Sequence, residues 1–308
     1  MKKFINTLMV LLSIFITTNS LLSCEKVNVE EKNKDKVVVN ITFSDFNYYF
    51  DEDDSPTRAS DKTPTEAGVN RIALSVFNSE GELVFETTKN ESVDVDDFDQ
   101  ISCALRPGDY SFVVVAHQAN GNENAAAISA MDKATITTAK LLKTFAVNQS
   151  VTILADQTNN VTIDLGKRVS SQFMLKLMDE QPAEVASCEI ILNPSVSAST
   201  DFVFNPSTGF ASDSYRYKNE FLRSNMKGET FKEKSLSVHC LVTENPQNVN
   251  VTINMKDASG NVVKSLTLTD VPMAPHRITR ATGNFFGSST KTNFLFDTED
   301  SPLYDISL

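Results

Sequence analysis

A chain of 308 residues, 41% of them hydrophobic, is long enough for two domains and apolar enough to bury their cores, which excludes wholesale disorder. The net charge of −12 excludes a nucleic-acid binder, because phosphate contacts require clustered Lys and Arg. The same charge excludes a basic lipid-binding surface, so any attachment to a membrane has to come from another feature.

The first 24 residues provide such a feature. Lys2 and Lys3 precede a short apolar run, Leu8 to Ile16, and the stretch LLSC ends at Cys24. A positive start followed by a short apolar run is typical of a signal peptide, and the run is too short to remain as a membrane-spanning helix. LLSC resembles a bacterial lipobox, where a signal peptidase cuts before a lipid-modified cysteine. We therefore expect residues 1–23 to be a lipoprotein signal peptide and Cys24 to be lipidated; the alternative is an ordinary secretory signal with a chance cysteine.

The composition changes twice after Cys24. Residues 24–36 mix both charges and carry almost nothing to bury, which predicts a flexible tether. The β-branched run Val37 to Phe43 then predicts a strand. The following segment, residues 44–68, is acidic and contains two prolines. A connection of this length inside a compact domain is either functional or mobile.

The first half of the remaining chain alternates apolar segments with turn residues. Two pairs of strands are predicted, at 71–88 and 101–118, each turned by a glycine-containing tetrapeptide. An Ala-rich segment, 122–143, is predicted to hold a short helix. Two further strands, at 151–154 and 161–165, complete an N-terminal β-sandwich. We place that domain at residues 37–167.

The second half repeats the pattern of the first. A second hairpin, at 249–269, again has a polar tip with glycine and a second strand that begins with two aliphatic residues. The similarity suggests two related β domains. Many short strands separated by turns predict an all-β fold of two tandem β-sandwich domains, with a short helix or irregular insertions. The C-terminal sandwich is placed at residues 168–308, and its other strands are predicted at 170–179, 186–193, 202–210 and 236–245.

The sequence carries no recognisable catalytic constellation, since it lacks a nucleophile elbow, a phosphate-binding glycine loop and a zinc-protease helix. We therefore expect no enzyme, no cofactor and no metal site. His239 and Cys240 are adjacent on a predicted strand and point to opposite faces, so they do not suit one ion, and His239 is expected near solvent. The acidic clusters at 51–54 and 94–99 are expected to be solvated loops, with calcium binding as the alternative.

Three cysteines remain once Cys24 is assigned to the lipid. They are expected to be buried thiols, and a bridge between two of them is the alternative, because the compartment would permit it. The residues are Cys103, Cys188 and Cys240, and the bridge would join the last two.

Taken in order, several segments resemble the fimbrillin superfamily of Bacteroidales, which comprises the FimA- and Mfa-type pilins and the Mfa-type anchor lipoproteins. The resemblance rests on the lipobox and on the first strand followed by a loop with TRAS. It also rests on NRIALSVFNSEGELV, LRPGDYSFVVVAHQAN, VTIDLGKRVSSQFMLKL and LTDVPMAPHRITRATGNFF. The resemblance implies two sandwiches of transthyretin-like topology and a surface pilus or adhesin.

The resemblance also implies how such a subunit would be processed. In pilins of this group a trypsin-like cut after an arginine frees the subunit from its lipid and its first strand, and a segment of another subunit fills the groove. Arg58, followed by Ala59, is the matching position here. The removable first strand would carry Val37, Val39, Ile41 and Phe43. The candidate donor residues are Phe294, Phe296, Tyr304, Ile306 and Leu308, although the same segment is equally interpretable as a strand of its own domain.

The resulting prediction is a fimbrial subunit or adhesin at the outer membrane and cell surface or fimbrium. Its partners would be other fimbrial subunits, as a homo- or hetero-polymer, and the outer membrane through the lipid on Cys24. A host protein or glycan is a further candidate partner, and nucleic acid is not. Two alternatives stay open: a permanently lipidated pilus anchor, and a lipid-tethered module that binds a glycan or protein.

Overall fold

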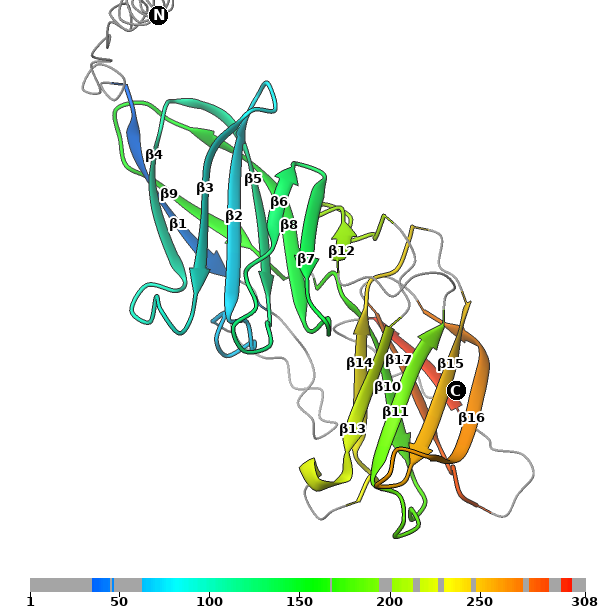
Figure 1. Cartoon of the computed structure of the whole chain (residues 1–308). Helices are drawn as coiled ribbons and strands as arrows, with labels where there is room; N and C mark the ends of the chain where they lie inside the picture. The colour runs from blue at the N-terminus through cyan, green and yellow to red at the C-terminus, as the bar shows by residue number, and fades with distance from the viewer. Residues whose placement is uncertain are drawn as a thin grey trace, which may run out of the picture. The chain divides into compact units, whose positions relative to one another are not determined.

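Strands dominate the computed structural model of the chain (Figure 1). The helical element of the described residues is one short 3-10 turn at Arg223–Asn225, and none of these residues forms a helix long and apolar enough to cross a membrane. The expected all-β fold is thus confirmed. The structure describes residues 35–44, 46, 63–166, 168–193, 201–212, 217–226, 230–244, 248–273, 277–287 and 295–300.

Two sheets build the N-terminal half and share one apolar cluster. The smaller sheet has the order β4-β1-β9, and the larger has the order β3-β2-β5-β8 (Figure 1). Each strand of the smaller sheet buries every second residue, which is the pattern of a sheet with one face on a core and one in water. The strands are β1 (Val37–Ser44), β2 (Arg71–Asn78), β3 (Leu83–Asn90), β4 (Gln100–Leu105), β5 (Gly108–His117), β8 (Thr144–Ile153) and β9 (Asn159–Asp164).

The C-terminal half repeats this topology. Strand β10 lies between antiparallel β14 and parallel β17, as β1 lies between antiparallel β4 and parallel β9. The second sheet has the order β13-β11-β15-β16, which corresponds strand for strand to β3-β2-β5-β8. An additional strand, β18 (Leu295–Asp300), extends the first sheet beyond β17. The remaining strands are β10 (Ser171–Leu177), β11 (Ser187–Asn193), β13 (Tyr217–Leu222), β14 (Ser235–Cys240), β15 (Asn248–Lys256), β16 (Val262–Pro272) and β17 (Arg277–Gly283).

A third sheet joins segments that the sequence assigns to different domains. It has the order β12-β7-β6, with β6 at Ala127–Ala130, β7 at Lys133–Thr137 and β12 at Asp201–Phe204. The larger of two apolar clusters contains residues of both halves and of this sheet. The domain boundary at residue 167 stays a prediction: the N-terminal sheets share a cluster of their own, whereas the larger cluster contains residues of both halves.

The helix expected at 122–143 is wrong, because β6 and β7 form a hairpin there. Ile128, Ala134 and Ile136 are buried and alternate with exposed or half-buried residues, which is the period of a strand. Pairing of β7 with β12 and packing of the hairpin into the large cluster outweigh the helical preference of alanine.

The two strands at 101–118 exist, but they do not pair with each other as expected. Strand β4 pairs with β1, whereas β5 pairs with β2 and β8, so the turn between them crosses from one sheet to the other. Gly108 adopts a φ of 150° in this turn, and the Tyr110 hydroxyl donates to the Arg106 carbonyl oxygen at 2.9 Å. A Pro-Gly turn therefore marked a change of sheet here.

Both predicted hairpins are confirmed, and their tips are built alike. Asn78 and Asp257 each accept backbone hydrogen bonds through Oδ1 from the residues two and four positions later. Gly81 and Gly260 then adopt φ values of 81° and 84°. The hairpins are not equivalent in the repeat, however, because β2–β3 and β15–β16 occupy different places in it. The similarity of the tips reflects turn chemistry, and the repeat lies in the strand order.

Candidate functional site

The residues predicted to form a removable first strand lie at the centre of the smaller N-terminal sheet. Strand β1 is antiparallel to β4, with Ile41 opposite Ile101, and parallel to β9, with Ile41 opposite Val161. Both long sides of β1 are therefore bonded to neighbours. Taking β1 away would leave a groove with unpaired backbone groups on the facing sides of β4 and β9.

One face of β1 carries apolar side chains into the core. Val39, Ile41 and Phe43 are buried, whereas Val37 at the start of the strand is half-buried. Phe46, just after the strand, is fully buried and packs edge-on against Phe145 with ring centroids 5.4 Å apart. Three of the four residues named for this strand therefore face the core, and the structure adds Phe46 to the buried set.

The opposite face of β1 carries a ladder of polar side chains that our sequence analysis missed. Ser102 Oγ on β4 donates to Asn40 Oδ1 at 3.1 Å, and Asn40 Nδ2 donates to Asn160 Oδ1 on β9 at 3.1 Å. One step further, the hydroxyl groups of Thr42 and Thr162 lie 3.5 Å apart. The signal was present in the sequence, because VNITF and NNVTI carry Asn and Thr at matching positions and β1 and β9 run parallel in that register.

The equivalent strand of the C-terminal half is built differently. Strand β10 buries six of its seven residues, so both of its faces are covered. Strand β1 alternates buried and exposed residues. Of these two equivalent strands, β1 alone has one face in water, and a replacement for it has to match one apolar face only.

Most of the other predicted site residues fall outside the described residues. This applies to the lipidation and processing positions. Part of the candidate donor segment, residues 295–300, is described and forms β18. The backbone at Phe296 pairs with Ala281 of β17, so residues 295–300 belong to a sheet of their own chain. The residues outside the description are Cys24, Arg58, Ala59, Phe294, Tyr304, Ile306 and Leu308.

The three predicted cysteines are buried and none of them is in a disulfide, as expected for strand thiols, so the alternative bridge between Cys188 and Cys240 is not present. Burial raises the pKa of Cys188 far above its ordinary value and that of Cys240 to about 12. His239 is buried, which corrects the expectation that it lies near solvent. Desolvation, reinforced by Arg168, lowers its pKa well below the ordinary value. These groups are inert core residues at neutral pH.

The acidic cluster at 94–99 is committed to internal contacts. Lys89 Nζ lies 3.5 Å from Asp94 Oδ1 and 2.6 Å from Asp97 Oδ2, and Asp94 Oδ2 accepts the Asn90 N–H at 2.7 Å. These bonds engage two of the four carboxylates of the cluster, those of Asp94 and Asp97. Among the described residues no group of three His, Cys, Asp or Glu side chains is arranged to hold a metal ion, and residues 51–54 lie outside them.

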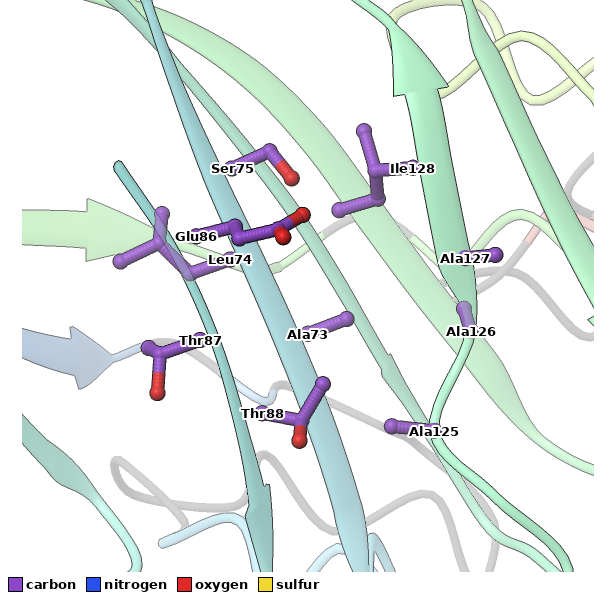
Figure 2. Close-up of a pocket in the computed structure, with 10 residues that line it drawn as sticks. All are labelled: Ala73, Leu74, Ser75, Glu86, Thr87, Thr88, Ala125, Ala126, Ala127 and Ile128. Atoms are coloured by element: carbon purple, nitrogen blue, oxygen red, sulfur yellow. The ribbon is translucent and has the colours of Figure 1, made fainter. Parts of the chain in front are cut away.

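A hollow of about 590 Å³ opens beside the free edge of β6 (Figure 2). Figure 2 shows Ala125 to Ile128 on one side and residues of β2 and β3 on the other, with Glu86 as the charged member of the lining. Besides Glu86 the lining has Ser75, which lies opposite Glu86 on the neighbouring strand, together with aliphatic and threonine side chains, and it has no aromatic side chain.

The described residues thus form an all-β fold in which β1 lies between β4 and β9. Residues 49–182 match the family model of the major fimbrial subunit protein, FimA. This confirms the resemblance to fimbrillins over residues 49–182. The match supports a fimbrial or adhesin role at the cell surface, in association with other fimbrial subunits. Among curated proteins, none matches in sequence.

Solved structures share the fold at low identity. A candidate polysaccharide-binding protein of the DUF1812 group from Bacteroides thetaiotaomicron is 13% identical with a TM-score of 0.51, over 86% of this chain and 98% of that one. A candidate cell adhesion protein from Bacteroides uniformis is 10% identical with a TM-score of 0.49, over 86% and 97%. The fimbrial anchor protein Mfa2 from Porphyromonas gingivalis is 10% identical with a TM-score of 0.44, over 86% and 98%. The likeness in fold rests on the first of these.

Proposed function

We propose that the chain is the lipoprotein precursor of a fimbrial subunit that polymerises by strand replacement. Cys24 carries the lipid that delivers the subunit to the outer membrane, and a trypsin-like protease cuts after Arg58. Strand β1 then leaves, and a segment of another subunit takes its place between β4 and β9. The observation that carries the proposal is the central position of β1 combined with burial of a single face.

The energetics support replacement over simple loss of the strand. Burial of each large apolar side chain contributes about 1.5–3 kcal/mol, and β1 with Phe46 brings four such side chains into the core. Loss of β1 would expose their partners and leave backbone groups unpaired on β4 and β9. An extended segment with alternating apolar residues would restore both the packing and the hydrogen bonds, which is the general mode of β-strand addition.

The donor is proposed to lie in the segment that follows β17, whose candidate inserting residues are Phe294, Phe296, Tyr304, Ile306 and Leu308. These residues occur at alternate positions within two short stretches, as strand insertion requires. Host protein or glycan binding would be a property of the assembled fimbria.

The test is to identify the N-terminal residue of the protein isolated from cells and from its fimbriae. We expect the subunits of the polymer to begin at Ala59. We expect an Arg58→Ala variant to keep Cys24 as its N-terminal residue and to stay out of the polymer. The buried residues Arg71 and Arg168 serve as internal controls, because an arginine-specific protease should leave them intact in the folded chain. A polymer whose subunits still begin at lipidated Cys24 would refute processing at Arg58 and favour the permanently lipidated anchor.

A further inference from the structure

The polar ladder on the outer face of β1 suggests how the register of an occupying strand is fixed. The ladder spans three strands at one level, from Ser102 through Asn40 to Asn160, with both bonds at 3.1 Å. All three side chains are exposed, so they add little to the core. Only a strand with a polar side chain at the level of Asn40 completes the ladder.

The apolar face alone would not fix the register. A shift of two residues returns every side chain of a strand to the same face, so it still places apolar residues in the groove. Such a shift would move Asn40 away from both Ser102 and Asn160. Discrimination between registers that differ by two therefore has to come from side-chain size inside the groove and from the outer ladder.

The segment Tyr304–Leu308 repeats the pattern of β1 position by position. YDISL and VNITF both read apolar, Asx, Ile, hydroxyl, apolar. Laid over Val39 to Phe43, the segment places Asp305 at the level of Asn40 and Ser307 at the level of Thr42. The Asp305 carboxylate would accept from Ser102 Oγ and from the Asn160 amide, and the Ser307 hydroxyl would face Thr162.

The competing stretch Phe294 to Phe296 fits less well. With its two phenylalanines at the levels of Ile41 and Phe43, Asn293 would stand at the level of Asn40, but Leu295 would stand on the outer face opposite Thr162 in place of a hydroxyl residue. Residues 295–300 are also paired with β17. The same alternation occurs in β9 and β15, but β15 is bonded on both sides, to β11 and β16, and β9 is itself one wall of the groove.

We infer that Ser102, Asn160 and Thr162 select the register of the incoming strand by its outer polar residues, and that the selected segment is Tyr304–Leu308 of a second copy. Asp305 then lies opposite Asn160, and Ser307 lies opposite Thr162. This inference rests on the proposed strand replacement and specifies its donor and its register.

Cysteine pairs in the full-length chain test the register directly. Directly opposite residues of neighbouring strands lie within disulfide reach, whereas a two-residue offset separates the Cα atoms by about 8 Å, beyond that reach. The matched pairs are Asn160→Cys with Asp305→Cys, and Thr162→Cys with Ser307→Cys. The offset control is Asn160→Cys with Ser307→Cys. The pair Asn160→Cys with Asn293→Cys tests the competing stretch, which would bring Asn293 opposite Asn160. The native cysteines of the described residues are buried and should not interfere.

After cleavage at Arg58 and mild oxidation, the matched pairs should give covalent multimers on non-reducing gels. A thiol reductant should convert these multimers to monomers. Covalent multimers from the Ser307→Cys pair or from the Asn293→Cys pair with Asn160→Cys would overturn the assigned register and donor. Polymer formation without a cross-link from any pair would do the same, and both results would leave strand replacement in place. If the cleaved wild-type chain forms no polymer at all, the proposed function fails, and this inference fails with it.

Substitution at Asp305 tests whether this polar side chain contributes to the selection of the donor strand. Because an exposed hydrogen bond contributes modestly, Asp305→Ala should lower the yield of polymer about two- to fivefold. Asp305→Asn should retain the wild-type yield, since an amide can make the bonds that Asn40 makes. Equal yields for Asp305→Ala and the wild type would show that the ladder does not select the donor.

Discussion

Replacement of Ile41 by alanine in the uncut chain should destabilise the N-terminal sandwich far more than replacement of its neighbour Thr42. Ile41 has no exposed surface and lies between Ile101 of β4 and Val161 of β9, both of which are buried. Thr42 is exposed, and its hydroxyl group contacts Thr162 at 3.5 Å. The two positions share one strand and one pair of neighbours, so they form a matched comparison.

The magnitude follows from burial. Ile41→Ala removes buried carbon atoms and leaves a cavity between the two sheets, which typically costs about 2–5 kcal/mol. Thr42→Ala removes one exposed contact of marginal length and should change stability by about 0.5 kcal/mol or less. The expected difference between the variants is therefore at least about 1.5 kcal/mol.

Urea denaturation followed by far-ultraviolet circular dichroism measures this difference. The slope of the free energy of unfolding against urea should be unchanged, so that the midpoint reports stability. Equal losses at the two positions, or an Ile41→Ala variant as stable as the wild type, would refute the description of β1 as a core strand buried on one face. The same result would remove the main support for strand replacement.

Three further predictions concern other buried polar groups and the thiols. Desolvation lowers the pKa of His117 to about 4, so the folded state binds fewer protons than the unfolded state between about pH 6.5 and 4, and stability should fall by about 2 kcal/mol on going from pH 7.5 to 5. His117→Gln should reduce this loss in urea titrations at the two pH values, and an unchanged loss would exclude His117 as its source. Arg71 donates four hydrogen bonds of 2.8 Å, to three backbone carbonyl oxygens and to Asn90 Oδ1, so Arg71→Lys should cost about 2–4 kcal/mol in thermal denaturation, and a wild-type melting curve would contradict this. The three buried thiols should resist a thiol reagent at pH 8 until denaturant is added, and fast labelling of the native protein would contradict their burial; they are Cys103, Cys188 and Cys240.

Local patterns predicted the elements of this protein well. The β-branched run Val37 to Phe43 predicted a strand, and the glycine-containing tips predicted both hairpins. These features depend on neighbours in sequence, such as the side-chain period of a strand or the positive φ that a turn requires. Where a distant partner decides the outcome, local pattern was insufficient. The segment 122–143 is rich in alanine, yet it forms strands because β7 pairs with β12 of the other half.

The candidate site was predicted in part for the same reason. The apolar residues of β1 were identified because their spacing is local. The ladder of Ser102, Asn40 and Asn160 was missed, because its members are separated by 62 and 120 residues and meet only through the order β4-β1-β9. His239 was expected near solvent, since the sequence does not tell which face of an edge strand is covered.

By itself the sequence determined that this chain is an acidic all-β protein, and it predicted the first strand from its β-branched residues. Only the tertiary structure decided that β1 lies between an antiparallel and a parallel neighbour and that its second face is in water. Strand pairing joins residues more than a hundred positions apart, and the free energy that selects those pairs comes from the packed sheets as a whole. The period of a strand shows which residues share a face, whereas the arrangement of the sheets decides what that face meets.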